Sequence, residues 1–335
     1  MTILRKVFSG IQPTGIPHIG NYLGAIKNWT RIQHQAQPGD TTIFSIVDLH
    51  SMTTHFDATQ RKQDTHQMLA SLLACGIDPL RCLVYRQSDV SCHTELSWVL
   101  GCLTSPKWLN HMHQWRSKRD KDKENSNLGL YSYPVLMSAD ILLFKATHVP
   151  VGDDQDQHLN LTRHLARAFN DRYGETFPVP ETMYTKASRI MSLRDPTSKM
   201  SKSEVNVKSR IDLNDSSKTI AKKISAAVTD SEPYISEDLA ERPAVKNLVS
   251  LYSELSGLSV TEIVQKYQGM QYFTLPFKKD LTELVVAELE PIRSEYNLLM
   301  DSPHYLHQIL ADGSDKARIM AESTLDEVYK KIGFR

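Results

Sequence analysis

The first two-thirds of this chain alternates short strand-like segments with longer helix-like segments. Residues 7–10, 41–47 and 82–85 are rich in β-branched and aromatic residues, as buried strands are. Between the second and third of these, residues 60–75 have apolar side chains at helical spacing, followed by Gly76 as a helix stop signal. A strand, a crossover helix and a parallel strand form an α/β unit. The sequence therefore predicts an α/β fold built on a doubly wound parallel sheet.

After about residue 204, strand-like segments nearly vanish. Helical spacing recurs over residues 213–228, 244–256, 260–267, 278–300 and 316–332, with prolines between these segments. Pro291 lies inside the fourth segment and predicts a kink or a split there. Since a chain of 335 residues has room for about two domains, we expect one domain over residues 1–204. A C-terminal helical domain over 205–335 follows, with its last helix as a candidate to pack back on the first domain.

The charge of the chain is balanced overall but uneven along its length. Lys and Arg number 39, as do Asp and Glu, and this zero net charge excludes a polycation that binds nucleic acid indiscriminately. Residues 186–223 nevertheless hold ten basic and four acidic side chains, and residues 116–123 hold five and two. Each segment fits either a solvated face or a phosphate-binding surface.

The apolar stretches and the cysteines indicate neither a membrane protein nor a metal-binding one. The longest apolar stretch, residues 135–144, is interrupted by Ser138 and Asp140 and is far shorter than the ~20 residues that a membrane helix needs. The four cysteines form no CxxC pair, so we expect free thiols in a reducing compartment and neither a zinc nor an iron–sulfur site. We therefore expect a soluble protein with no membrane partner.

A Gly- and Pro-rich turn follows the first strand-like segment, reading FSGIQPTG from residue 8 and PHIGN from residue 17. A helix is expected to begin near His18, and the N-terminus of a helix presents free N–H groups that bind anions. His18 and Asn21 are three residues apart on its first turn, so both can donate to one phosphate. Such turns are also common in proteins that bind no nucleotide, so the motif alone leaves an ordinary turn open.

A second motif, KMSKS at residues 199–203, lies where the two expected domains join. Lys199 and Lys202 are three residues apart with hydroxyl groups between them. This pattern suits a pyrophosphate, whose negative charge grows as its bond to the rest of a nucleotide breaks. On its own, the motif also fits an exposed polar loop.

Taken together, the HIGN and KMSKS motifs resemble the two signatures of class I aminoacyl-tRNA synthetases. The stretches IVDLHS, YPVLMSADILL, VPVGDDQDQH, RIMSL and KISAAVTDSE further resemble the tryptophanyl-tRNA synthetase family, and with the two signatures they cover nearly the whole chain in order. One departure is Glu204-Val205-Asn206, where the family more often has Asp-Pro-Asn. The departure affects only the exit of the KMSKS loop.

This resemblance implies a Rossmann-like catalytic domain with a helical insertion over residues 1–204, ending in the KMSKS loop, and a helical anticodon-binding domain over 205–335. It implies ATP-dependent ligation of L-tryptophan to tRNA(Trp) through a tryptophanyl-adenylate, with release of AMP and pyrophosphate. ATP is then a substrate, and Mg²⁺ is bound through its phosphates rather than by a protein cage. Relatives work as homodimers, so we expect a homodimer that binds tRNA(Trp) and no DNA.

Asp140 stands in an apolar run, and a buried carboxylate needs a partner. Helix capping or an ion pair with Lys or Arg would each satisfy it. The resemblance implies instead that Asp140 accepts a hydrogen bond from the indole N–H, which phenylalanine cannot offer. It also implies an indole pocket walled by Phe8, Gly10, His50, Met137, Val149 and Val151, with the α-amino group held by Tyr133 and Gln155.

The resemblance also assigns the nucleotide site and the catalytic groups. It implies ATP contacts from Gln12, Pro13, Thr14, Gly20, Asn21, Gly152, Asp153, Asp154, Ile190, Lys199, Met200, Ser201, Lys202 and Ser203. The residues expected to act in catalysis are His18, Asn21, Lys118, Lys199 and Lys202, with Gln114 as the companion of Lys118. Because the tryptophan carboxylate is already an anion, no general base is needed. We expect catalysis by positioning and by positive charge from His18, Lys199 and Lys202.

Three alternatives stay open at this point. A tyrosyl-tRNA synthetase shares the fold and both signatures, a small-molecule nucleotidyltransferase can carry a similar His-containing turn, and a non-catalytic tRNA-binding relative would carry damaged motifs, whereas both are intact here. Residues 113–115, 147–155 and 162–166 resemble fungal or other mitochondrial enzymes more than bacterial ones. We therefore expect the mitochondrial type and a location in the mitochondrial matrix, with the bacterial cytoplasm as the alternative.

Overall fold

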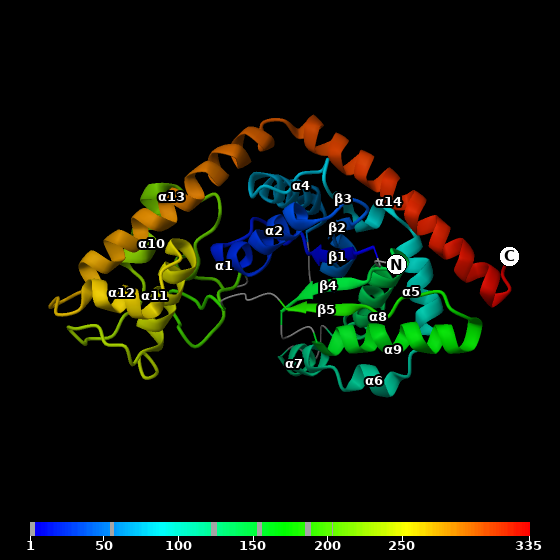
Figure 1. The fold of residues 1–335 in the computed structure, drawn as a ribbon, viewed down its shortest axis with the longest axis horizontal. Coiled ribbons are helices and arrows are strands. Elements are labelled where there is room, and N and C mark those ends of the chain that lie inside the picture. The colour runs from blue at the N-terminus through cyan, green and yellow to red at the C-terminus, as the bar shows by residue number, and fades with distance from the viewer. Residues whose placement is uncertain (1–3, 54–56, 122–125, 153–155, 185–188, 203) are drawn as a thin grey trace.

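The computed structural model describes residues 4–53, 57–121, 126–152, 156–184, 189–202 and 204–335. A five-stranded parallel sheet lies at its centre, in the order β3-β2-β1-β4-β5 (Figure 1). Its strands are β1 (Lys6–Ile11), β2 (Thr41–Ile46), β3 (Leu83–Arg86), β4 (His148–Val151) and β5 (Glu181–Tyr184). The predicted parallel α/β sheet is confirmed, and β1 to β3 form at the three predicted segments.

The sequence does not predict β4 and β5. β4 contains Pro150, which is uncommon inside a sheet because it lacks an N–H group, and β5 has no buried residue. Both strands lie on the opposite side of β1 from β2 and β3, so the strand order reverses between β1 and β4. In open parallel sheets, ligands bind at such a reversal, beyond the carboxyl ends of the strands.

Alternate residues of β2 enter two different hydrophobic cores, as the pleat of a strand requires. Phe44 and Ile46 pack in one core with residues of α2 and α4, and Ile43 packs in the other with residues of α5, α8 and α9. The helical elements of this part are α1 (Ile19–Asn21), the π-helical turn η1 (Tyr22–Ile26), α2 (Lys27–Gln35), α3 (Asp48–Ser51), α4 (Ala58–Ala74), the 3-10 turn η2 (Gln87–Asp89), α5 (Cys92–Gly101), α6 (Pro106–Asn110), α7 (His113–Lys121), α8 (Leu128–Leu143) and α9 (Asp156–Tyr173).

The chain after residue 204 is helical, as predicted. Its elements are the turn η4 (Val207–Ser209), α10 (Ser217–Ser225), α11 (Pro243–Ser256), α12 (Val260–Tyr267), α13 (Thr274–Met300) and α14 (Pro303–Ile332). No split occurs at Pro291, because α13 continues through it. α14 begins at Pro303, in the first turn where proline is favoured, rather than near residue 316. Among the helices of the described residues, none combines the length and the apolar character needed to span a membrane.

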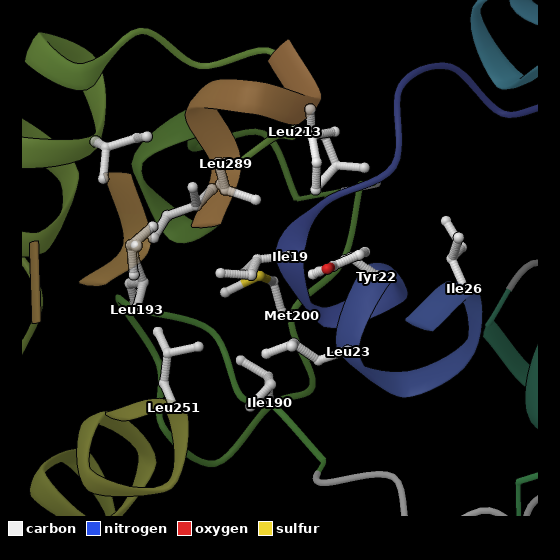
Figure 2. Packing of buried hydrophobic residues seen from close by; sticks show 14 of the residues in the cluster. Ile19, Tyr22, Leu23, Ile26, Ile190, Leu193, Met200, Leu213, Leu251 and Leu289 are labelled. Carbon is white, nitrogen blue, oxygen red and sulfur yellow. The ribbon is translucent and has the colours of Figure 1, made fainter. Parts of the chain in front are cut away.

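α13 and α14 form an arch over the molecule (Figure 1). α13 packs against α4, α10 and α11, whereas α14 returns along β3 and α5. At Gly313, α14 approaches the edge strand so closely that a Cβ atom would lie 1.8 Å from the carbonyl oxygen of Val84. The core around Ile19 and Leu23 of the first part continues through Met200 to Leu289 of α13 (Figure 2). The helical part is therefore joined to the sheet by a shared core as well as by α14.

Candidate active site

A cavity of about 330 Å³ opens where the strand order reverses, between the ends of β1 and β4. This volume lies in the range of small-molecule sites. The cavity is lined by Phe8, Ser9, Gly10, Gln12, Gly24, Ala25, Trp29, Val47, His50, Gln114, Tyr133, Met137, Asp140, Ile141, Val149, Pro150 and Gly152. Mostly apolar walls with few polar groups suit a ligand that has an apolar body and a small number of hydrogen-bonding groups.

Residues that the sequence assigns to tryptophan and ATP gather at this cavity. Lining residues among them are Phe8, Gly10, His50, Tyr133, Met137, Asp140 and Val149 for tryptophan, Gln12 and Gly152 for ATP, and Gln114. Four others, Asp153, Asp154, Gln155 and Ser203, lie outside the described residues, as do the side chains of Val151 and Lys118. The fold thus brings together side chains that are far apart in the sequence.

Asp140 is the charged group of the cavity. Its side chain is buried on α8, and its Oδ2 lies 2.7 Å from His50 Nε2. Gln87 Nε2 donates to Oδ1 at 2.7 Å, and His93 Nδ1 lies 2.7 Å from the same oxygen. Burial by itself raises the pKa of Asp140, but the neighbouring His93 and His50 outweigh burial and hold this pKa well below its usual range. The carboxylate is therefore ionised.

The described partners of Asp140 are two imidazoles and an amide, rather than a helix N-terminus, Lys or Arg. An ionised carboxylate has about four acceptor positions. His50 and Gln87 occupy two of them, so Asp140 can accept a further hydrogen bond from a donor in the cavity. Gln87 and His93 belong to no motif, and their only sequence signal is a polar run directly after a buried strand.

Tyr133 is oriented by two neighbours at the wall of the cavity. Its hydroxyl donates to Gln114 Oε1 at 2.8 Å and lies 2.8 Å from His158 Nε2. Because the hydroxyl has a single proton, which Gln114 receives, His158 Nε2 is the donor in the second contact. An oxygen held in this way at the wall of the cavity suits contact with an ammonium group.

His18 begins α1 as its N-cap residue. Its Nδ1 accepts from the Asn21 N–H at 3.2 Å, and Asn21 Oδ1 accepts from the His18 N–H at 3.2 Å, which is a capping box. Burial, followed by the charges of Lys202, Arg210 and Lys199, lowers the pKa of His18 to about 3. His18 is therefore a neutral donor through Nε2–H, which corrects the expectation that it contributes positive charge.

The KMSKS segment lies against the turn of the first motif. Lys202 Nζ donates to the Gly15 carbonyl oxygen at 2.8 Å and lies 3.4 Å from Thr14 Oγ1. Burial lowers the pKa of Lys202 to about 8, although Asp212 and Asp64 oppose this shift. The structure therefore brings the two motifs together, as their proposed joint role requires.

The predicted adenine contacts at residues 190 and 200 have buried side chains. Ile190 and Met200 pack against Ile19 and Leu23 of the signature helix (Figure 2), and the Met200 N–H donates to the Ile190 carbonyl oxygen at 3.1 Å. Their side chains are thus part of the core. Among the described residues, no group of three His, Cys, Asp or Glu side chains could hold a metal ion.

The sequence of this chain matches a known family over most of its length. Residues 4–290 match the family model described as tRNA synthetases class I (W and Y). The chain belongs to this family. The tryptophan–tRNA ligase of Rickettsia conorii is 43% identical over 332 residues, which cover 98% of this chain and 99% of that protein. The tryptophan–tRNA ligase of Caldanaerobacter subterraneus is 44% identical over 331 residues, covering 98% of each.

Solved structures agree with this class I assignment. The tryptophanyl-tRNA synthetase of Campylobacter jejuni, complexed with ADP and tryptophan, is 36% identical with a TM-score of 0.83 over 98% of this chain and 99% of that chain. The tyrosyl-tRNA synthetase of Aeropyrum pernix, with a TM-score of 0.69, is 17% identical over 92% of this chain and 89% of that chain. It shares the fold alone. The predicted class I synthetase fold is confirmed.

Proposed function

We infer that this class I synthetase ligates L-tryptophan to tRNA(Trp) in an ATP-dependent reaction. Identity above 40% to tryptophan–tRNA ligases over almost the whole chain supports this inference. Within the site, the observation that supports this activity is the buried carboxylate of Asp140. A buried carboxylate between apolar walls is complementary to an apolar ring that has one N–H donor, and it would be left without that donor if phenylalanine were bound.

We propose the following arrangement of tryptophan in the cavity. The indole ring lies among Phe8, Gly10, His50, Met137, Val149 and Val151, and its N–H donates to Asp140. The α-amino group is held by Tyr133, whose hydroxyl is already oriented by Gln114, and by Gln155. The carboxylate then faces the turn at Gln12, where ATP enters.

In the first step, an oxygen of the tryptophan carboxylate attacks the α-phosphorus of ATP. A new P–O bond forms, the bond to the bridging oxygen breaks, and pyrophosphate leaves with the electron pair. ATP enters as its Mg²⁺ complex, with the metal held by the phosphates. Lys199 and Lys202 offset the charge that develops on pyrophosphate, while His18 and Asn21 donate hydrogen bonds as neutral groups.

The remaining ATP contacts are proposed from the same site. They comprise Gln12, Pro13, Thr14, Gly20, Gly152, Asp153, Asp154, Ile190, Met200, Ser201 and Ser203, with Lys118 at the phosphates. The backbone at residues 190 and 200 is the adenine contact, since both side chains are buried in the core.

In the second step, the terminal ribose hydroxyl of tRNA(Trp) attacks the carbonyl carbon of the adenylate. The bond from this carbon to the phosphate oxygen breaks, AMP leaves with the electron pair, and the hydroxyl proton passes to the departing phosphate. We propose that residues 1–204 carry out this chemistry and that the helical part over 205–335 binds the anticodon end. Exposed cations of the segment 186–223 would contact phosphates of the tRNA.

A homodimer is proposed as well. A groove of about 770 Å³ runs between α5 and α8, and two large side chains on it, Trp98 and Leu128, are 75% and 77% exposed. Exposed apolar surface of this kind favours an interface with a second copy. Light scattering of the purified protein distinguishes a dimer from a monomer.

The mitochondrial matrix is the proposed location, on the resemblance at residues 113–115, 147–155 and 162–166. The similar ligases named above are bacterial, and the bacterial cytoplasm is the alternative. Imaging a fluorescent fusion in the source cell distinguishes the two.

The proposed activity is tested by pyrophosphate exchange with each amino acid in turn. Tryptophan should support exchange and tyrosine should not.

Asp140→Asn should lower the ratio of kcat/KM for tryptophan to that for phenylalanine by about 10-fold or more, because a hydrogen bond to a charged group is lost. Asp171→Asn, at an exposed position of α9, is the control. Exchange with tyrosine, or an unchanged ratio in Asp140→Asn, would overturn the assignment.

A further inference from the structure

Gln87 is a wholly buried amide with a defined orientation. It lies in η2, directly after β3, and its side chain bridges a hydrogen-bond donor and a hydrogen-bond acceptor. The Leu49 backbone N–H, which can only donate, points at Oε1 at 3.1 Å, and the ionised Asp140, which can only accept, receives Nε2–H at 2.7 Å. Both partners require the same placement of the amide oxygen and nitrogen.

The segment that holds Gln87 is fixed to α3 by further hydrogen bonds. The Ser88 N–H donates to Asp48 Oδ1 at 2.9 Å, and Ser88 Oγ donates to Asp48 Oδ2 at 2.5 Å. α3 also carries His50, which contacts the other oxygen of Asp140. One rigid unit of α3 and η2 therefore supplies a partner to each oxygen of the Asp140 carboxylate.

His93 is a further neighbour of the same carboxylate oxygen. Its Nδ1 lies 2.7 Å from Asp140 Oδ1, and its Nε2 lies 2.9 Å from the Tyr85 hydroxyl, which is itself buried. The short contact between His93 Nδ1 and Asp140 lacks the geometry of a hydrogen bond, whereas the Gln87 amide supplies a directed donor. Direction matters because the carboxylate can rotate about its bond to Cβ unless both oxygens are held.

We propose that Gln87 is a positioning residue that fixes the plane of the Asp140 carboxylate and thereby sets the preference for a ligand with an indole N–H. This proposal rests on the proposed function, in which Asp140 accepts that N–H. A hydrogen bond to a carboxylate depends on the direction of approach. A carboxylate that is free to turn would therefore bind the indole ring nearly as well but would discriminate less for its N–H.

The test uses Gln87→Met, which keeps the length of the side chain and removes the donor. Pyrophosphate exchange is measured with tryptophan and with the benzothiophene analogue, in which sulfur replaces the indole N–H. We expect kcat/KM for tryptophan to fall about 10-fold through a higher KM, with little change in kcat or in the KM for ATP. The analogue, which makes no hydrogen bond to Asp140, should lose less than about twofold, so the ratio of the two substrates falls.

Gln33→Met is the matched control. Gln33 is likewise buried and its amide also bridges an acceptor and a donor, here two backbone groups, the Gly76 carbonyl oxygen and the Asp78 N–H. It does not line the described cavity. Its substitution should change the two substrates by the same factor. Equal losses for the two substrates in Gln87→Met would mean that Gln87 acts only on stability and would overturn the proposal.

A second variant, Gln87→Glu, covers the case in which Gln87→Met does not fold. A protonated Glu donates to Asp140 as the amide does, whereas an ionised one repels it. The preference for tryptophan over the analogue should then fall as pH rises, more steeply than in the wild type. A parallel pH dependence in both proteins would overturn the proposal. If the wild type itself does not prefer tryptophan over the analogue, the role of Asp140 in the proposed function fails, which is a separate result.

Discussion

Two buried side chains of the site, His18 and Asp140, both have basic side chains as neighbours. Burial disfavours the charged form of each. Around Asp140, two imidazoles stabilise the anion, so its pKa falls despite burial. Around His18, three cationic side chains add to the effect of burial, so the imidazole stays neutral. A fixed anion therefore faces the proposed amino-acid site, and a neutral donor flanked by cations faces the proposed nucleotide site.

We expect His18→Asn to flatten the dependence of folding stability on pH. The pKa of His18 is about 3 in the folded protein and 6.5 in an unperturbed chain. Acidification therefore protonates the unfolded state first, and this group alone removes about 2 kcal/mol from the free energy of unfolding between pH 7 and 5. Asn keeps an N-cap acceptor for the Asn21 N–H. Urea unfolding at both pH values measures the change.

The control for this measurement is His34→Asn, at an exposed position of α2. It should leave the difference between pH 7 and 5 as in the wild type. An equal loss of stability on acidification in His18→Asn and in the wild type would contradict the neutral, buried state of His18.

Lys202 predicts an alkaline limit on activity. Its pKa is about 8, because burial disfavours the ammonium form. If this ammonium offsets charge on pyrophosphate, kcat/KM for ATP should fall as pH rises above about 8, since this parameter reports the free enzyme. Lys202→Arg should be slower but should lack that decline, because Arg stays charged. Pyrophosphate exchange between pH 7 and 9.5 provides both profiles.

Lys208→Arg serves as the control, since Lys208 is exposed on the same segment. Its profile should match that of the wild type. A decline in Lys202→Arg as steep as that of the wild type would assign the alkaline limit to another group.

At the scale of elements, the π-helical turn η1 links the cavity to the helical part. Gly24 and Ala25 of η1 line the cavity. Tyr22 and Lys27 reach α13, where the Tyr22 hydroxyl and Lys27 Nζ donate to the same Glu288 oxygen at 2.7 and 2.8 Å. π-Helical turns are rare and often lie at functional sites. A displacement of α13 would therefore act directly on the wall of the cavity.

The elements that the sequence predicts best are those with complete local signals. α12 forms at residues 260–267 as predicted, and Ser259 and Glu262 cap it as a capping box. β4 and β5 give no such signal, because one contains Pro150 and the other lies at the sheet edge with no buried residue. The early start of α14 follows Pro303 in its first turn, whereas no local pattern records its packing along β3 and α5.

In the site, too, residues with local sequence signals can be predicted, whereas residues that depend on contacts between distant segments cannot. Motif residues such as His18 and Lys202 are found from the sequence because their neighbours in the chain carry the signal. Gln87 and His93 are not, because their role arises only when the end of β3 meets α8. The neutral state of His18 is also unpredictable locally, since it depends first on burial and then on Lys202 and Arg210 from distant segments.

Gly313 is the position where α14 depends on having no side chain. Gly313→Ala would place a Cβ atom 1.8 Å from the Val84 carbonyl oxygen, so the helix must move away from β3. We expect a loss of more than about 2 kcal/mol in the free energy of unfolding, the cost of overpacking against a backbone. Asp312→Ala, on the exposed side of the same helix, should stay within about 0.5 kcal/mol. Chemical denaturation of both variants measures this, and equal stabilities would contradict the close packing.

At the scale of the whole molecule, the basic segment 186–223 divides into two sets. Arg210 pairs with Asp212 and Lys223 with Asp215, and these pairs lie within the junction between the sheet and the helical part. Described members at exposed positions are Arg189, Arg194, Lys199, Lys208, Lys218 and Lys222. These exposed cations are available to a polyanion, so the zero net charge of the chain is compatible with a localised phosphate-binding surface.

The proposed tRNA contact makes a prediction for this exposed set. Lys218 and Lys222 are four residues apart on α10 and thus lie on one face of the helix. Replacing both by Ala should weaken tRNA(Trp) binding and lower the slope of log K against log salt concentration by about 0.7–0.9 for each phosphate that is no longer neutralised. Fluorescence titration of labelled tRNA at several salt concentrations measures the slope.

Tryptophan-dependent pyrophosphate exchange should be unchanged in this double variant, because the exchange reaction needs no tRNA. Lys330→Ala, near the C-terminal end of α14 and far from α10 (Figure 1), is the control and should keep the wild-type slope. A salt-independent affinity in the wild type would remove the electrostatic contact altogether. A wild-type slope in the double variant with a reduced slope in Lys330→Ala would instead place the tRNA along α14, beside the sheet, rather than along α10.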